Sequence, residues 1–259
     1  MRDLGLEEAI RVAGGVGALA KKLGISQPSV SNWSRVPAER VLSVEAATGV
    51  SRAALRPDLY AEHAWAAGDV DEVDAARAQE YGLISVLLAR APDALLLQRL
   101  ATLRGDASPL GLAHAALAEA AERTTVERVE REYFDLFIGL GRGELLPYGS
   151  YYLTGFLHER PLARFRAHLD KLGIERAEGQ AEPEDHAAIL CEIMAGLASQ
   201  RFPAPPGSDR EVFEQHLAPW IGRFFADLEQ ADAADFYRRI GALGRVFITI
   251  ETEAFALPS

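Results

Sequence analysis

Apolar residues recur at three- and four-residue intervals along almost the whole chain, a spacing that places them on one face of successive α-helices. Alanine, leucine, glutamate and arginine are abundant, and all four favour helices. Residues 246–250 read locally like a strand, but they continue a helical pattern that starts at Phe236. We therefore predict an all-α fold and place residues 246–250 in a buried helix.

Glycine and proline residues interrupt this pattern and divide the chain. In the first sixty residues they separate four or five short helices. A small, acidic and weakly periodic stretch follows at residues 66–74, and we interpret it as part of a linker. The predicted organisation is a domain at residues 1–62, a connector at 63–76 and a second domain at 77–259.

The second domain is predicted to contain nine helices. Thr124 and Glu127 have the spacing of a capping box, in which two side chains bond free amides at a helix start. The helices are expected at residues 75–90, 93–104, 109–122, 125–140, 150–157, 161–172, 183–200, 210–228 and 232–256.

Charge is unevenly distributed along the chain. Residues 1–60 hold eight Lys and Arg against six Asp and Glu. The remaining 199 residues hold nineteen against thirty-two, a net charge of −13. The first domain can therefore approach phosphate, whereas the second is expected to repel nucleic acid and attract basic segments.

Cys191 is the only cysteine, so the chain can form neither an internal disulfide nor a thiolate metal site. Charged residues close to Met1 interrupt any signal-peptide core. No apolar run reaches the roughly 18 residues that a membrane span requires. We therefore expect a soluble cytoplasmic protein with no membrane contact and no bound cofactor.

Residues 18–33 have the spacing of a helix-turn-helix. Ala20 is small enough to let a second helix cross, and Gly24 can adopt the left-handed backbone of the turn. Ser26 can cap the second helix, and Pro28 falls in its first turn, where no amide partner is lost. The residues expected to face inward are Val30, Trp33, Leu19, Leu23 and Ile25.

This segment resembles the helix-turn-helix of phage repressors and Cro, and over about residues 4–60 it is most similar to the YdaS-like antitoxin subgroup. The resemblance implies DNA binding through residues 16–35, with Gln27 and Asn32 at base edges and other side chains at phosphates. The similarity rests on the motif together with residues 36–40, 46–49 and 55–60. The implied DNA-binding residues are Lys21, Gln27, Pro28, Ser29, Ser31, Asn32 and Arg35.

Two features of this segment depart from the subgroup. The connection between Trp33 and Pro37 is shortened, and the recognition helix has little positive charge. The alternative is therefore a helical module without affinity for DNA, or one used only for pairing. Because helix-turn-helix proteins usually read paired half-sites, DNA binding would imply a homodimer.

The motifs of the second domain also have local explanations. Residues 182–186, Glu-Pro-Glu-Asp-His, fit a helix start with proline in the first turn. Residues 132–137, Glu-Tyr-Phe-Asp-Leu-Phe, fit a helix core, and the glycines at 139–143 lack the context of a nucleotide loop. His186 lacks the paired spacing of a zinc site. Since no catalytic arrangement stands out, we predict a protein that is not an enzyme and holds no metal.

Taken in order, these motifs resemble those of the TorD/DmsD family of molybdoenzyme maturation chaperones over residues 80–257. The resemblance implies an all-helical fold, sometimes dimerised by segment exchange. It also implies binding of an apo-molybdoenzyme, of the formate dehydrogenase or DMSO/TMAO reductase type, or of its twin-arginine signal peptide. The stretches that carry it are residues 132–137, 147–153, 182–186 and 213–225. The implied client-binding residues are Tyr133, Phe137, Pro147, Ser150, Tyr151, Glu182, Pro183, Asp185 and His186.

The chemistry of such a client suits an acidic domain rich in aromatic residues. Guanidinium groups need carboxylates that accept paired hydrogen bonds, and an apolar stretch needs an aromatic-lined groove. We expect Glu182 and Asp185 to bind the arginines, and His186 to orient a carboxylate or to make the site pH-sensitive. One hypothesis is a chaperone with a DNA-binding domain; the other is a transcriptional regulator whose helical domain senses a client or ligand.

Overall fold

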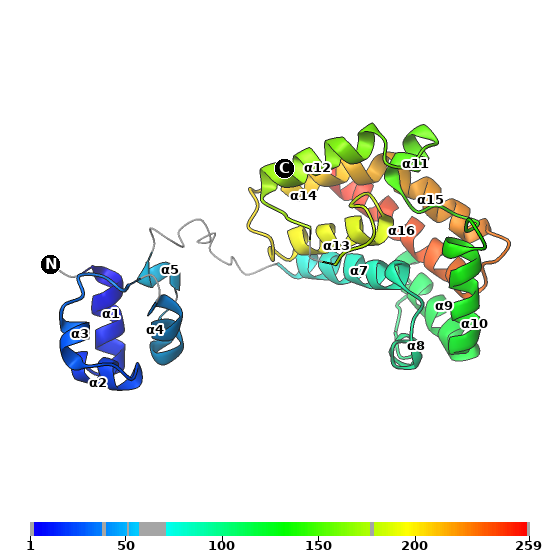
Figure 1. Ribbon diagram of the computed structural model, residues 1–259. Helices are drawn as coiled ribbons and strands as arrows, with labels where there is room; N and C mark the ends of the chain where they lie inside the picture. Colours follow the sequence, from blue (N-terminus) through cyan, green and yellow to red (C-terminus); the bar gives the residue numbers. More distant parts are fainter. Residues whose placement is uncertain (1–2, 38–39, 51, 57–70, 177–178, 258–259) are drawn as a thin grey trace. The chain divides into compact units, whose positions relative to one another are not determined.

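The computed structural model describes residues 3–37, 40–50, 52–56, 71–176 and 179–257. The chain divides into two compact units, Met1–Asp69 and Val70–Ser259, and each has a hydrophobic core of its own. Every regular element in the described residues is a helix (Figure 1), which confirms the predicted all-α fold.

The amino-terminal unit is built from short helices around a small aliphatic core. Helix α1 starts after Asp3, whose carboxylate accepts a hydrogen bond from the Leu6 amide at 2.8 Å, and it ends at Gly14 with left-handed backbone. The helices described in this unit are α1 (Leu4–Ala13), α2 (Val16–Lys22), α3 (Gln27–Ser31), α4 (Val41–Thr48) and α5 (Arg52–Leu55).

The turn between α2 and α3 has the predicted form. Gly24 adopts a φ of 67°, in the region that favours glycine. The Ser26 hydroxyl accepts a hydrogen bond from the backbone amide three residues later at 3.4 Å, and Pro28 lies in the first turn of α3. Val30 is buried and Trp33 is half-buried in the core of the unit, so the predicted helix-turn-helix is confirmed.

The carboxy-terminal unit is a larger helical assembly. Helices α7 and α13 lie side by side, and α16 packs against both α15 and α9 (Figure 1). Its helices are α7 (Glu72–Ala89), α8 (Ala94–Ala101), α9 (Pro109–Arg123), α10 (Val126–Tyr133), α11 (Gly149–Thr154), α12 (Arg160–Leu172), α13 (Ala187–Ala198), α14 (Ser208–Val212), α15 (Ala218–Gln230) and α16 (Phe236–Ala256), with π-helical turns η3 (Phe134–Ile138) and η4 (Phe213–Leu217).

A buried ion-pair network joins α7, α14 and α16. Arg77 Nε donates to Glu251 Oε1 at 2.9 Å, and Arg77 Nη1 donates to Asp74 and Asp209 at 2.7 and 3.0 Å. The hydroxyl of Tyr81 donates to Glu251 Oε2 at 2.8 Å. Because Glu251 is only 1% exposed, its charge depends on these partners rather than on water.

The starts of α10 and α13 differ from the sequence prediction in ways that bear on the predicted motifs. Thr125, not Thr124, caps α10. The helix expected at residues 183–200 begins at Ala187, with His186 as its cap, so Pro183 lies outside the helix. The reason for the second difference is non-local, because the residues before α13 hydrogen-bond to another segment of the chain.

Two further predictions, the helix over residues 246–250 and the connector, can be compared with the structure. Residues 246–250 lie inside α16, as predicted. Residues 72–76, which the sequence analysis assigns to the connector, belong to α7, whose start is capped by Asp71. The rest of the predicted connector falls largely on residues 57–70, outside the described part of the chain.

Candidate functional site

Two motif segments that are distant in sequence lie next to each other in the carboxy-terminal unit. An isolated antiparallel bridge pairs Tyr148 with His186. On either side of it, the Gly149 amide donates to the Asp185 carbonyl at 2.9 Å, and the Ala187 amide donates to a carbonyl at position 147 at 2.8 Å. We call residues 147–151 and 182–186 together the bridge site.

Asp185 faces the interior of the bridge site. Its side chain is buried, and its Oδ2 accepts a hydrogen bond from the Ser150 amide at 2.7 Å, near the start of α11. A cavity of about 20 Å³ lies beside it, far below the roughly 300 Å³ at which ligand pockets begin. The carboxylate therefore holds α11 against the segment before α13, and the expectation that Asp185 binds a client arginine stays a prediction.

Gly149 lies against an indole in the same part of the site. A Cβ at Gly149 would lie 3.0 Å from Nε1 of Trp220, which is tighter than an ordinary contact. The Trp220 indole donates to the His216 carbonyl at 2.8 Å, so its position is fixed. The glycine of this motif is therefore explained by a close approach of backbone to a buried aromatic ring.

His186 caps α13. Its Nδ1 accepts a hydrogen bond from the Ala188 amide at 3.1 Å, which requires that nitrogen to be unprotonated. Burial lowers the pKa of His186 to about 4, while the charges of Glu182 and Asp185 act in the opposite direction. At neutral pH the ring is therefore neutral, and it serves as a helix cap rather than as a cation.

The bridge site has two half-buried carboxylates, Glu182 and Glu184, and Glu184 is paired with Arg166. Glu182 Oε2 accepts a hydrogen bond from the Tyr148 hydroxyl at 2.6 Å. Burial raises the pKa of the Tyr148 hydroxyl, and the Glu182 carboxylate raises it further. Tyr148 was absent from the predicted site residues, although it stands between Pro147 and Ser150 in the motif.

The aromatic residues of the motif at 132–137 approach the bridge site from η3 and the end of α10. Tyr133 donates to the Ala89 carbonyl at 3.0 Å, and its ring lies 5.1 Å from Phe137 and 5.8 Å from Tyr237. Burial raises the pKa of Tyr133, and the Glu182 charge adds to this effect. Tyr133 and Phe137 are half-buried, so both are partly accessible.

The remaining predicted site residues have mixed exposure. Pro147 and Ser150 are buried, whereas Pro183 and Tyr151 are half-buried. Tyr151 accepts a hydrogen bond from Arg142 Nη2 at 3.0 Å, and the guanidinium lies over its ring. The partly accessible groups of the site are therefore aromatic rings, the Glu182 carboxylate and the Glu184 carboxylate, which is paired with Arg166.

The predicted DNA-binding residues all lie on the surface of the amino-terminal unit. The Ser29 and Ser26 hydroxyls are 2.7 Å apart at the start of α3. The Gln27 side chain lies along α2, 3.4 Å from where a Cβ on Gly17 would stand. The exposed residues are Lys21, Gln27, Pro28, Ser29, Ser31, Asn32 and Arg35.

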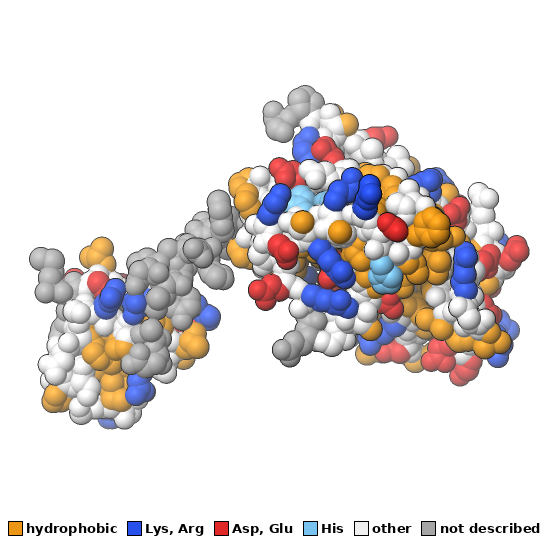
Figure 2. Space-filling view, turned by 45° about the horizontal axis from the view of Figure 1, so that its top comes forward, with side chains coloured by type: hydrophobic (Ala, Val, Ile, Leu, Met, Phe, Trp, Pro, Cys, Tyr) orange, Lys and Arg blue, Asp and Glu red, His pale blue; other side chains and the backbone are white. Residues whose placement is uncertain are grey.

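The surface of the carboxy-terminal unit is mixed in charge. On the face in Figure 2, acidic and basic side chains are interspersed among apolar ones rather than gathered into one acidic patch. Within the described ranges, no three His, Cys, Asp or Glu residues are grouped so that they could hold a metal ion. None of the helices described is both long and apolar enough to cross a membrane.

Family models match both units. The family described as nitrate reductase delta subunit matches residues 104–226, and the family described as bacterial toxin YdaS matches residues 6–64. The two matches fall in the two units that the structure separates.

Named relatives are chaperone proteins. Chaperone protein TorD of Vibrio cholerae is 30% identical over 126 residues, 45% of this chain and 57% of that protein. Chaperone protein TorD of Shewanella loihica is 25% identical over 209 residues, 72% of this chain and 96% of that protein. The chain thus spans little more than half of the Vibrio cholerae relative but nearly all of the Shewanella one.

A solved structure from Archaeoglobus fulgidus, described as a redox enzyme maturation protein, aligns at a TM-score of 0.44 and 20% identity, covering 68% of this chain and 93% of that one. That likeness is too weak to support an inference. In sequence, the carboxy-terminal unit is similar to chaperone proteins of the TorD/DmsD family, and a unit similar to the YdaS family precedes it.

Proposed function

We propose that this chain is a cytoplasmic chaperone that binds the basic leader segment of an apo-molybdoenzyme and holds the enzyme until its cofactor is inserted. Similarity to chaperone proteins named TorD supports the chaperone role, and the relatives' names describe chaperones rather than enzymes. The client is of the formate dehydrogenase or DMSO/TMAO reductase type.

One observation carries the proposal: the half-buried Glu182 carboxylate accepts a hydrogen bond from the Tyr148 hydroxyl, in a site whose other half-buried side chains include aromatic rings. A guanidinium can bond a carboxylate and stack on aromatic rings at the same time. Glu182 and the accessible rings are therefore the proposed client contacts.

The other bridge-site residues have a supporting role in this proposal. Asp185, His186 and Ser150 are buried, and their hydrogen bonds hold the two segments in register. Pro147 and Pro183 stand at the ends of the paired segments. Tyr151, from α11, adds an accessible ring next to Arg142.

A peptide titration tests the proposal. The probe is a synthetic peptide with two adjacent arginines followed by a leucine-rich stretch, and the protein is the full chain. Glu182→Gln should weaken binding by about tenfold or more, because a hydrogen bond to a charged group contributes about 1.5–3 kcal/mol.

Glu214→Gln, at an exposed position in η4, is the matched control and should leave the affinity unchanged. Equal affinities of the wild type and the Glu182→Gln variant would show that the client contacts lie elsewhere on the protein. No binding by the wild type would refute the chaperone proposal for this class of leader.

We also propose that the amino-terminal unit binds DNA, as a regulator whose state responds to the client. The YdaS match over residues 6–64 and the exposed positions of the predicted contacts support this. Client binding can shift DNA affinity only if the client prefers one state of the chain.

Selection from a random duplex library with the full chain tests DNA binding. The affinity should fall as salt rises, and Lys21→Ala should reduce the salt slope by about one. Asn32→Ala should instead relax base preference. If the full chain retains no duplex at low salt, the amino-terminal unit is a helical module that does not bind DNA.

A further inference from the structure

A cavity of about 420 Å³, which we call the Ser85 cavity, lies between α7 and α13. Gly82, Ser85 and Ala89 line it from α7, and Glu192 and Ala195 line it from α13. The small side chains among these residues leave room beside the two helices. Because small-molecule sites have volumes of about 300–1,000 Å³, the cavity can hold a small molecule.

The Ser85 hydroxyl has no hydrogen-bond partner in the described part of the chain, although the residue is only 8% exposed. Other helical hydroxyls behave differently. Those of Thr154, Ser199 and Thr252 donate to the carbonyl four residues earlier at 2.6–2.8 Å. Since buried polar groups usually find a partner, the Ser85 hydroxyl is available to bond a ligand in the cavity that it lines.

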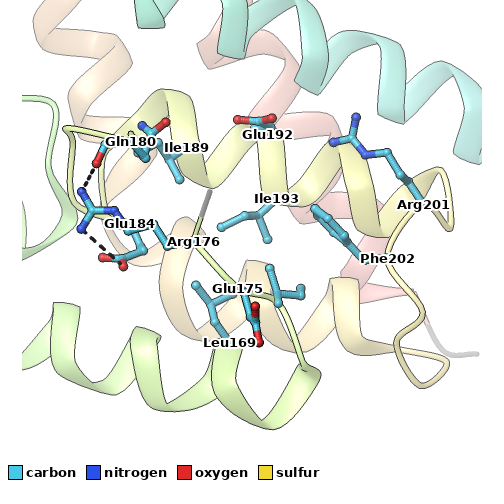
Figure 3. A pocket seen from close by; sticks show the side chains of 11 residues that line it. Leu169, Glu175, Arg176, Gln180, Glu184, Ile189, Glu192, Ile193, Arg201 and Phe202 are labelled. Carbon is cyan, nitrogen blue, oxygen red and sulfur yellow. Dashed lines mark hydrogen bonds and ion pairs between the residues drawn. The ribbon is translucent and has the colours of Figure 1, made fainter. Parts of the chain in front are cut away.

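Two arginines line the same cavity. Arg90 follows the last residue of α7, and Arg201 lies shortly after the end of α13. Both are exposed, and neither guanidinium is in an ion pair or hydrogen bond with any residue that the structure describes. Figure 3, which shows the neighbouring cavity of about 320 Å³, draws Arg201 without a bond to Glu192 or to another labelled side chain.

The charge of this lining differs from that of the unit as a whole. Residues 61–259 have a net charge of −13, so an arginine there readily finds a carboxylate, as Arg77 and Arg245 do. The Ser85 cavity instead has two guanidinium groups against one carboxylate, that of Glu192. Salt screens charges beyond about 8 Å, so the lining decides the local preference. That preference is for an anion.

The ends of the two helices offer another explanation for Arg90 and Arg201. Cations near a helix C-terminus are favoured by the helix dipole. Where an arginine of this unit serves backbone carbonyls it bonds them directly, as Arg223 Nη2 does with the Tyr152 carbonyl at 2.8 Å. Within the described ranges, neither Arg90 nor Arg201 makes such a bond. The geometry therefore favours a ligand as their partner.

We propose that the Ser85 cavity binds a phosphate group, either as the free anion or as an ester of a small molecule. Guanidinium groups present paired N–H donors that match phosphate oxygens, and the Ser85 hydroxyl can donate a further hydrogen bond. Val86, Ala89 and Ala195 supply apolar surface for the rest of an ester. No bridge-site residue lines this cavity, so the inference does not depend on client binding.

Phosphate binding by the full chain tests the proposal. The probes are inorganic phosphate and phenyl phosphate, each titrated at constant ionic strength in a calorimeter. The wild type should bind at least one of them. Tighter binding of phenyl phosphate would identify an ester as the ligand, because its ring buries apolar surface. Tighter binding of inorganic phosphate would identify the free anion.

Substitutions in the lining should change the affinity in opposite directions. Arg90→Gln and Arg201→Gln should each weaken binding by about tenfold or more, because each removes a charged hydrogen-bond donor. Ser85→Ala should weaken it by about fivefold. Glu192→Gln should strengthen it several-fold, since it removes the carboxylate that repels the anion.

Two matched controls lie outside the cavity lining. Arg239→Gln removes an exposed arginine of α16, and Ser199→Ala removes a hydroxyl that already bonds the Ala195 carbonyl. Both should leave the affinity within about twofold of the wild type. Arg90 and Arg201 are exposed, so their variants should fold like the wild type, which circular dichroism checks.

Three results would overturn the proposal. If the wild type binds neither probe, the two arginines serve only the helix ends. If binding is unchanged in both Arg90→Gln and Arg201→Gln, the anion binds elsewhere, for example on the amino-terminal unit. An equal loss of affinity in Arg239→Gln would show a general effect of charge rather than a site.

Discussion

Tyr148 and His186 face each other across the isolated bridge, with ring centroids 5.0 Å apart and planes at 75°. The Tyr148 hydroxyl bonds Glu182, while the His186 imidazole caps α13. A single backbone pairing therefore sets the position of the accessible carboxylate and the start of a core helix. Changes to this pair should affect both stability and client binding.

The neutral state of His186 makes stability depend on pH. Its pKa of about 4 lies below the ordinary value of 6.5, so the unfolded state binds the proton more tightly. The contribution of His186 to the free energy of unfolding is fully present above pH 6.5. It should fall by about 3 kcal/mol as the pH drops towards 4. His186→Asn can keep the cap without titrating, so urea unfolding should show a weaker pH dependence. Identical pH profiles would contradict this role.

Glu132 should stabilise the carboxy-terminal unit through the start of α16. Its carboxylate accepts hydrogen bonds from three consecutive amides, those of Asp235, Phe236 and Tyr237, at 2.6–3.1 Å. Glu132→Ala leaves these amides without an acceptor and should cost about 2–4 kcal/mol in urea unfolding. Asp135→Ala, on the exposed side of η3, should change stability by no more than about 0.5 kcal/mol. Similar effects of the two variants would refute the assignment.

Arg77 should contribute far more to stability than an exposed arginine in a similar pair. Arg77→Met leaves the buried Glu251 charge without its main partner and should cost about 3–5 kcal/mol. Arg245→Met breaks an exposed pair with Glu229 and should cost at most about 1 kcal/mol. Thermal and urea unfolding of the full chain measure both. A loss below 1 kcal/mol for Arg77→Met would show that the network is not needed for stability.

Gly24 should be the sensitive glycine of the amino-terminal unit. Its φ of 67° is unfavourable for other residues, so Gly24→Ala should cost about 1–2 kcal/mol. Gly17→Ala, in helix α2, should be neutral or stabilising because alanine favours helices. Amide hydrogen exchange of peptides from residues 3–37 reports this unit alone. Faster amide exchange in the Gly17→Ala variant than in the Gly24→Ala variant would contradict the prediction.

The bridge site could be located only in part from the sequence. The resemblance grouped the segments at 147–151 and 182–186, and the structure pairs them. It did not give their roles, because Asp185 turns inward to the Ser150 amide, while Glu182 remains accessible. Tyr148 was missed, since a tyrosine carries no sign of its partner in the sequence.

The sequence by itself determined the all-α fold and the helix-turn-helix, because both depend on neighbours along the chain. Apolar spacing defines a helix face, and Gly24 with Ser26 defines a turn and a cap within a few residues. Only the tertiary structure decided where α13 begins and which carboxylates are accessible. Those features depend on hydrogen bonds and packing between segments far apart in the chain, which local spacing does not encode.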